Sequence, residues 1–180
     1  MPFESATFSS GPYARNWGPE GQSPLVTQIC STSQFLRGLL VQMRFGEFTR
    51  APLRLLRLHV LDDVVECDWM ARYPDPWDAD LSQSIQQRHA SLQTLRDAID
   101  VRALLFSFMP WVETAHCRVY RESSNAAREM IIKGCVQRND HSSRDVHSLV
   151  MRAKVLGFRF DMEGDTMREI SIEESICIGS

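Results

Sequence analysis

The sequence predicts an α+β domain, in which an antiparallel sheet of about six strands, built from three hairpins, carries helices mainly on one face. Two patterns alternate along the chain. Paired short segments of alternating apolar residues are separated by segments whose apolar residues recur at helical spacing. The chain has 180 residues, of which 43% are hydrophobic and 24% charged, a composition typical of a globular protein. We expect one domain over residues 25–180, preceded by an irregular arm over residues 1–24.

The arm is rich in glycine and proline and shows no apolar periodicity, which favours an extended or irregular conformation. It nevertheless carries aromatic residues four or five positions apart, and purely solvating tails are usually poor in aromatics. These candidate partner-binding residues are Phe3, Phe8, Tyr13 and Trp17. The arm is therefore expected to pack either on its own domain or on a neighbouring molecule.

The first helix is predicted over residues 32–45. Ser31 and Gln34 have the spacing of a capping box, in which Ser31 caps the helix and Gln34 reaches back to it. Apolar residues then recur at helical spacing as far as Gly46, a natural stop.

Residues 53–71 predict a hairpin whose register follows from a two-residue loop at Asp62 and Asp63. In this register one face of the hairpin is continuously apolar, and a slip by one residue would destroy it. The predicted apolar pairs are Val60 with Val65, Leu58 with Cys67, and Leu56 with Trp69.

The opposite face of the same hairpin pairs His59 with Glu66 and Arg57 with Asp68. This constellation could transfer protons or bind an anionic ligand. A solvated sheet face with cross-strand ion pairs explains it more simply, and we expect that arrangement.

The second helix is predicted to begin after Asp80 and to place Arg96 and Asp97 on its solvent side. From residue 101 the sequence becomes nearly continuously apolar as far as Pro110. Two outcomes fit this run: a helix buried on all sides, or a change to extended structure.

Two more hairpins and a third helix complete the prediction. One hairpin covers residues 114–138, and the last turns at Gly164. Ser142 and Asp145 have capping-box spacing at the start of the helix between them, which Gly157 ends.

Four residues around that helix start could bind a divalent metal, because they combine carboxylates with imidazoles. They are Asp140, His141, Asp145 and His147. Helix capping and a solvated turn also explain them, and no further ligand follows from the spacing, so we expect no metal. His116 and Cys117 are neighbours on a predicted strand, so their side chains point to opposite faces and cannot form a dyad.

Charge and cysteine content narrow the function classes. The formal charge is −3, and the 18 arginines are dispersed without a basic run, so nucleic acid is not an expected partner. The five cysteines include no C-x-x-C pair, which favours reduced thiols and a cytoplasmic location. No segment is long and apolar enough to span a membrane. The terminal Cys177 lies in a poor match to a prenylation box.

The standard catalytic motifs are missing from the sequence. We therefore expect a non-catalytic intracellular interaction domain, a subunit or accessory factor of a larger protein assembly, without a cofactor. The alternatives are a small-ligand-binding or enzymatic domain with a pocket between helices and sheet, and a nucleic-acid-associated protein that uses an arginine surface formed on folding.

Overall fold

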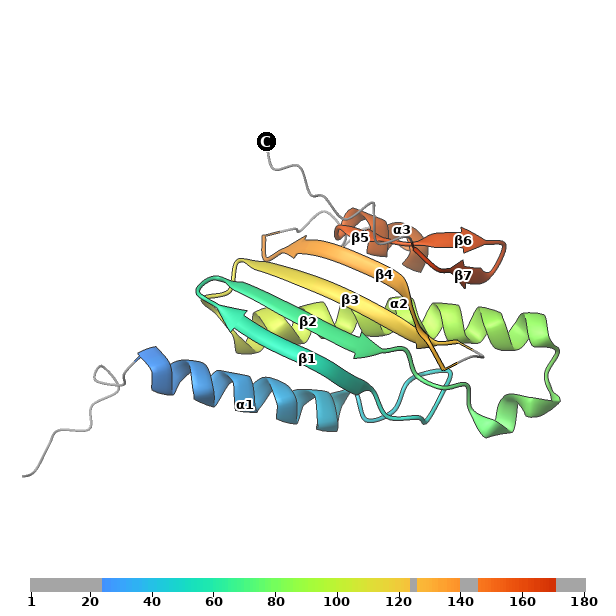
Figure 1. Ribbon diagram of the computed structural model, residues 1–180, viewed down its shortest axis with the longest axis horizontal. Coiled ribbons are helices and arrows are strands. Elements are labelled where there is room, and N and C mark those ends of the chain that lie inside the picture. The colour runs from blue at the N-terminus through green and yellow to red at the C-terminus, as the bar shows by residue number, and fades with distance from the viewer. Residues whose placement is uncertain (1–23, 124–125, 140–145, 171–180) are drawn as a thin grey trace, which may run out of the picture.

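The computed structural model describes residues 24–123, 126–139 and 146–170 (Figure 1). The predicted arm therefore lies outside the described residues, except for Pro24. The elements in chain order are α1 (Pro24–Gln42), β1 (Arg54–Leu61), β2 (Val64–Met70), a 3₁₀ helix (Pro76–Asp80), α2 (Gln83–Phe108), β3 (Thr114–Glu122), β4 (Arg128–Gln137), α3 (Leu149–Val155), β5 (Phe158–Arg159), β6 (Asp161–Glu163) and β7 (Thr166–Arg168).

The fold is α+β, as predicted, but the sheet is mixed. Five strands follow the order β1-β2-β3-β4-β5, with β2 and β3 parallel and every other pair antiparallel. Strands β6 and β7 form a separate two-stranded sheet. The prediction of about six antiparallel strands from three hairpins is therefore wrong, and the reason lies in α2.

Helix α2 is a single helix of 26 residues that includes the apolar run from residue 101 onward. Val101, Leu104 and Leu105 are buried in the core, so the run is a buried helix and not a strand. Figure 1 shows α2 crossing behind the sheet, and α1 packs against α2. Because the chain returns along α2 before β3 begins, β3 runs parallel to β2.

Helix α1 begins at Pro24, eight residues before the predicted start at residue 32. Proline is favoured in the first turn because it has no backbone N–H to leave unpaired there. Ser31 is consequently inside the helix, and the predicted capping box is wrong. The Ser33 hydroxyl donates to the Ile29 carbonyl at 2.9 Å, a bond typical of a serine in a helix interior.

The β1–β2 hairpin has the predicted register over most of its length. Val60 lies opposite Val65, Leu58 opposite Cys67, and Leu61 opposite Val64. A bulge interrupts the ladder, so Leu55 and not Leu56 lies opposite Trp69. A bulge adds one residue to one strand, and alternation alone does not reveal it.

The last hairpin differs from the prediction because β5 joins the main sheet beside β4, while β6 and β7 pair with each other. Gly157, at φ +91°, ends α3 in the left-handed conformation that glycine favours. A Cβ on Gly134 would lie 2.7 Å from the Phe158 ring, so Gly134 allows β5 to approach β4. The helix start at α3 is capped by Ser148; the predicted cap at residues 142–145 lies outside the described residues.

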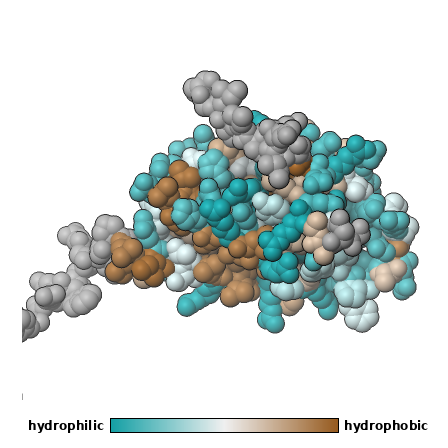
Figure 2. All heavy atoms as spheres, viewed as in Figure 1, coloured by the Kyte–Doolittle hydropathy of each residue, from teal (hydrophilic) through white to brown (hydrophobic). Residues whose placement is uncertain are grey.

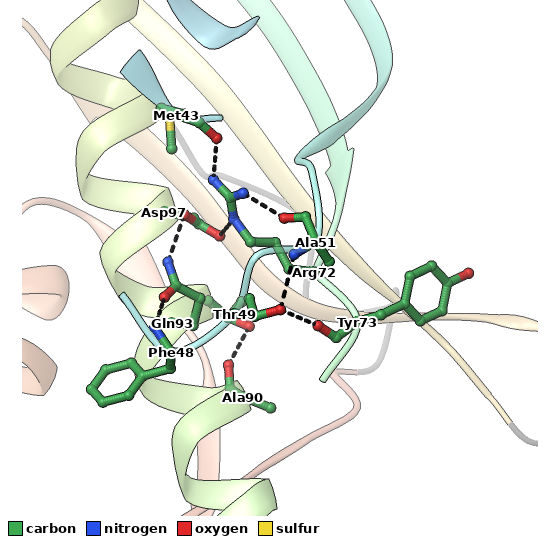
Figure 3. A network of polar contacts seen from close by, with 10 residues as sticks. Met43, Phe48, Thr49, Ala51, Arg72, Tyr73, Ala90, Gln93 and Asp97 are labelled. Carbon is green, nitrogen blue, oxygen red and sulfur yellow. Dashed lines mark hydrogen bonds and ion pairs between the residues drawn. The ribbon is translucent and has the colours of Figure 1, made fainter. Parts of the chain in front are cut away.

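A buried arginine links three parts of the fold (Figure 3). Arg72 follows β2, and its Nε donates to the Asp97 carboxylate on α2 at 2.8 Å. Its two terminal nitrogens donate to the carbonyls of Ala51 at 2.7 Å and Met43 at 2.6 Å, both in the connection between α1 and β1. The side chains of this ion pair are 1% and 2% exposed. Their mutual pairing, and not solvent, must therefore balance both charges.

Asp97 also anchors the loop after α1. Gln93 donates to its second carboxylate oxygen at 2.9 Å and accepts the backbone N–H of Phe48 at 2.8 Å. Burial raises the pKa of Asp97 above its ordinary value, and the Arg72 hydrogen bond opposes this rise. The prediction that Asp97 lies on the solvent side of the helix is wrong, because Asp97 is buried. Helical spacing alone does not reveal this, since the partner that balances its charge, Arg72, is 25 residues away in sequence.

We predict that Arg72→Met destabilises the protein by about 3–5 kcal/mol, because it leaves the Asp97 carboxylate buried and uncompensated. The double variant Arg72→Met/Asp97→Leu should recover part of this loss. It should stay less stable than the natural chain, because the carbonyls of Met43 and Ala51 lose their donor. Urea unfolding of all four members of the cycle measures the coupling, and additive losses would contradict it.

Two glycines with positive φ offer a matched pair. A Cβ on Gly157 would lie 2.7 Å from the Cys135 carbonyl oxygen, whereas one on Gly164 (φ +59°) meets no atom within 4 Å. Gly164→Ala should cost about 1–2 kcal/mol from the left-handed backbone alone. Gly157→Ala should cost at least about 1 kcal/mol more, because the carbonyl must move. Equal free energies of unfolding for the two variants would show that the approach of β5 to β4 is not tight.

Candidate functional site

The outer face of the sheet, which points away from α2, carries polar residues in rows across the strands. Alternation places every second residue of β2, β3 and β4 on this face. One row of register partners is His59, Glu66, His116 and Cys135; the next is Arg57, Asp68, Arg118, Lys133 and Arg159, one residue from each of β1 to β5. A third row, Met70, Tyr120 and Met130, is more apolar.

The four predicted residues of the β1–β2 hairpin do share this face, with His59 opposite Glu66 and Arg57 opposite Asp68. Their ion pairs differ from a strict cross-strand pattern, because β3 lies beside β2. Arg57 pairs diagonally with Glu66 at 2.8 Å, and Asp68 pairs with Arg118 of β3 at 2.8 Å. The hydrogen bond to Asp68 raises the pKa of Arg118. Sequence analysis missed Arg118, because its contact with Asp68 depends on the parallel pairing of β2 with β3, which was not predicted.

The side of this face near β5 is rich in positive charge. A hollow of about 550 Å³ lies there. Its charged lining residues are four cations, Arg118, Lys133, Lys154 and Arg159, and one carboxylate, Glu66. His116 and Cys135 also line it, whereas the Cys117 side chain is buried in the core, as the alternation of the strand predicts. Sequence analysis did not identify the cations, which come from four elements that meet only in the folded chain.

A second unusual surface is the outer side of α1. Four of its apolar side chains are exposed at 62%, 58%, 38% and 73%: Leu25, Ile29, Leu36 and Leu40. At 3.6 residues per turn they fall within an arc of about 60°. We call these four residues the α1 stripe. Figure 2 shows hydrophobic residues gathered at the end of the molecule where α1 begins.

The remaining predicted residues are placed as follows. Phe3, Phe8, Tyr13 and Trp17 lie outside the described residues, as do Asp140, His141 and Asp145. His147 is described and exposed just before α3. Among the described residues, no three His, Cys, Asp or Glu side chains are grouped so that they could hold a metal ion.

A further hollow, of about 370 Å³, lies between the first half of α2 and the β6–β7 hairpin. Its polar groups hold the hairpin in place: Ser91 accepts the Met167 backbone N–H at 3.2 Å, and Arg121 donates to the Met167 carbonyl at 3.0 Å.

In the described part of the chain no helix is long and apolar enough to cross a membrane.

No protein-family model, no curated protein and no solved structure matches the chain.

The four described cysteines are thiols and differ in exposure. Cys67 and Cys117 are buried register partners on β2 and β3, whereas Cys30 and Cys135 are exposed. Burial raises the pKa of Cys117 to about 12, and burial also raises the pKa of Cys67. Since the thiolate is the reactive form, iodoacetamide at pH 8 should modify Cys30 and Cys135 and spare Cys67 and Cys117. Peptide mass spectrometry measures the four sites separately, and equal labelling in urea is the control.

Proposed function

We propose that the protein is a non-catalytic interaction domain that works as a subunit of an assembly, and that its first partner is a second copy of this chain bound along α1. The observation that carries the proposal is the α1 stripe. Large apolar side chains exposed side by side on one element are typical of interaction surfaces.

The residues along one side of α1 and just after it follow a heptad pattern that is apolar except at Thr32. Its positions are separated by steps of four and three residues in strict alternation: Leu25, Ile29, Thr32, Leu36, Leu39 and, just after the helix, Met43. This is the spacing by which two helices pack along a common seam. Leu39 and Met43 are buried in the core, so the end of the seam packs within the chain. Its first half is exposed and supports contact with another helix.

The stripe is self-complementary in an antiparallel pair. If two α1 helices cross at the point between Thr32 and Ser33, Leu25 lies opposite Leu40 of the second copy. Ile29 then lies opposite Leu36 of the second copy. Two-fold symmetry repeats both contacts, as an interface between identical chains requires.

The polar residues of α1 fit the same arrangement. The small side chains of Thr32 and Ser33 would lie at the crossing, where they let the two helices approach closely. The one charged residue of the helix is Arg37, and the same pairing places it opposite Gln28 of the second copy. No like charges meet, so nothing opposes burial of the apolar stripe.

The aromatic segment over residues 1–23 ends where α1 begins. In an antiparallel pair the start of α1 lies beside the end of the partner's α1, near two exposed residues, Val41 and Phe45. We include Phe3, Phe8, Tyr13 and Trp17 in the proposed interface for this reason. Deleting residues 1–23 should raise the dissociation constant of the dimer, which analytical ultracentrifugation measures.

A reducing compartment, and hence the cytoplasm, is the proposed location. The buried register partners Cys67 and Cys117 are both free thiols, which supports this assignment.

We predict a native mass twice the chain's 20.6 kDa. Ile29→Glu should reduce it to the mass of one chain, because the new carboxylate would be buried against Leu36 of the second copy. Gln34→Glu adds the same charge on the opposite, exposed side of α1 and should leave the dimer intact. Size-exclusion chromatography with light scattering measures the masses.

Both substitutions replace exposed side chains, so circular dichroism should show unchanged folding in each variant. A natural chain that is monomeric at every accessible concentration would sink the proposed dimer. A dimer that survives Ile29→Glu would place the interface elsewhere.

A further inference from the structure

The hollow beside β5 contains an arrangement of charge that folding alone does not favour. Arg118 of β3 lies directly opposite Lys133 of β4, and Lys133 lies directly opposite Arg159 of β5. Three cations therefore occupy one row across three neighbouring strands. Like charges directly opposite each other destabilise a sheet.

The charge of this row is compensated only at its β2 end. Arg118 pairs there with Asp68 at 2.8 Å and with Glu66 at 3.4 Å, and Arg57 also pairs with Glu66 at 2.8 Å. Among the described residues no carboxylate forms an ion pair with the Arg159 guanidinium. The Lys154 ammonium nitrogen lies 5.6 Å from the centre of the Phe160 ring, and no described carboxylate forms an ion pair with it.

The backbone around the hollow is built to place Arg159 in the row. Gly157 turns the chain out of α3 with φ +91°, and Gly134 leaves room for the Phe158 ring under β5. These two glycines bring a two-residue strand against β4, and the second residue of that strand is Arg159.

The dimensions fit a small ligand. The hollow's volume of about 550 Å³ lies within the usual range for small-molecule sites. Neighbouring strands are about 4.8 Å apart, so the three cations of the row are based within about 10 Å. The Arg159 fork and the ammonium groups of Lys133 and Lys154 match an anion with several charged oxygens, and Arg118, which pairs with Asp68 and Glu66, adds positive charge at the edge of the site.

We propose that this hollow binds a small, multiply charged anion, a phosphate-bearing or polycarboxylate molecule, through Arg118, Lys133, Lys154 and Arg159. The net charge of the chain is −3, so the attraction is local to this site and not a property of the whole surface. The proposal stands independently of the dimer, because none of the α1 residues lines the hollow.

The test is isothermal titration calorimetry of the full chain with two probes, inorganic pyrophosphate and citrate. We expect saturable binding of at least one probe with one site per chain; the probe that binds more tightly identifies the phosphate or the carboxylate class. Arg159→Gln and Lys154→Gln should each weaken binding at least tenfold. Arg50→Gln removes an exposed positive charge in the loop between α1 and β1, outside both the hollow and the proposed dimer interface, and should leave the affinity unchanged.

Several results would overturn the proposal. These are no saturable binding of either probe, the same loss of affinity in Arg50→Gln, or affinity retained in both hollow variants. A short single-stranded RNA is the third probe. RNA binding that depends on Arg159 without binding of either small anion would show that the row serves a nucleic acid instead.

Thermal unfolding gives a second readout. Without ligand, Arg159→Gln should raise the Tm by up to roughly 4 °C, because it removes a cation directly opposite Lys133. Pyrophosphate or citrate should raise the Tm of the natural chain and have a smaller effect on the variant. A lower Tm for ligand-free Arg159→Gln would show that the guanidinium stabilises the fold, and would remove the like-charge argument.

Discussion

The buried ion pair between Arg72 and Asp97 is the constraint on which the arrangement of the elements depends. A charge nearly removed from solvent is tolerated only with a partner and with its remaining hydrogen bonds made, and both conditions hold here. Arg72 follows β2, Asp97 lies in the middle of α2, and the two carbonyl acceptors lie between α1 and β1. One side chain therefore fixes β2, α2 and the α1–β1 connection relative to one another. Displacing any of them would leave a buried polar group unpaired.

The same constraint explains why two surfaces remain exposed. The network holds α1 at its C-terminal end, through Met43 and the following loop, and the core covers Leu39. The first turns of the helix extend away from this anchor (Figure 1), and their residues Leu25 and Ile29 are exposed. The long crossover places α2 on one face of the sheet. The polar rows lie on the other face, which α2 therefore does not cover.

What could be predicted from the sequence is what local pattern determines. The β1–β2 register followed from a two-residue loop and an alternating face, so His59 and Glu66 were placed opposite each other correctly. The parallel pairing of β2 with β3 could not be predicted in this way, because it depends on 26 helical residues folding back as one crossover. Asp97 was misplaced for a related reason, since a buried carboxylate is recognised only with its partner. The cation row, which consists of Arg118, Lys133 and Arg159, could be identified only from two strand pairings, β3 with β4 and β4 with β5. The second depends on the backbone conformation of Gly157, which apolar periodicity does not encode.

The stripe and the cation row are costs of opposite kinds. Exposed leucines and isoleucine on α1 lower solubility while leaving the fold intact, whereas opposed cations lower stability while leaving solubility intact. Neither is required by the core, which is complete without the α1 stripe and without Arg159. The side chains of the α1 stripe and of Arg159 are not needed for folding, although elements that folding does need hold them in place. Contacts outside the folded chain explain them best. An apolar stripe is buried favourably by another apolar surface, and the Arg159 and Lys154 cations are stabilised by negative charge. The partners that we propose for the two surfaces therefore differ, a second chain for α1 and an anion for the outer face of the sheet.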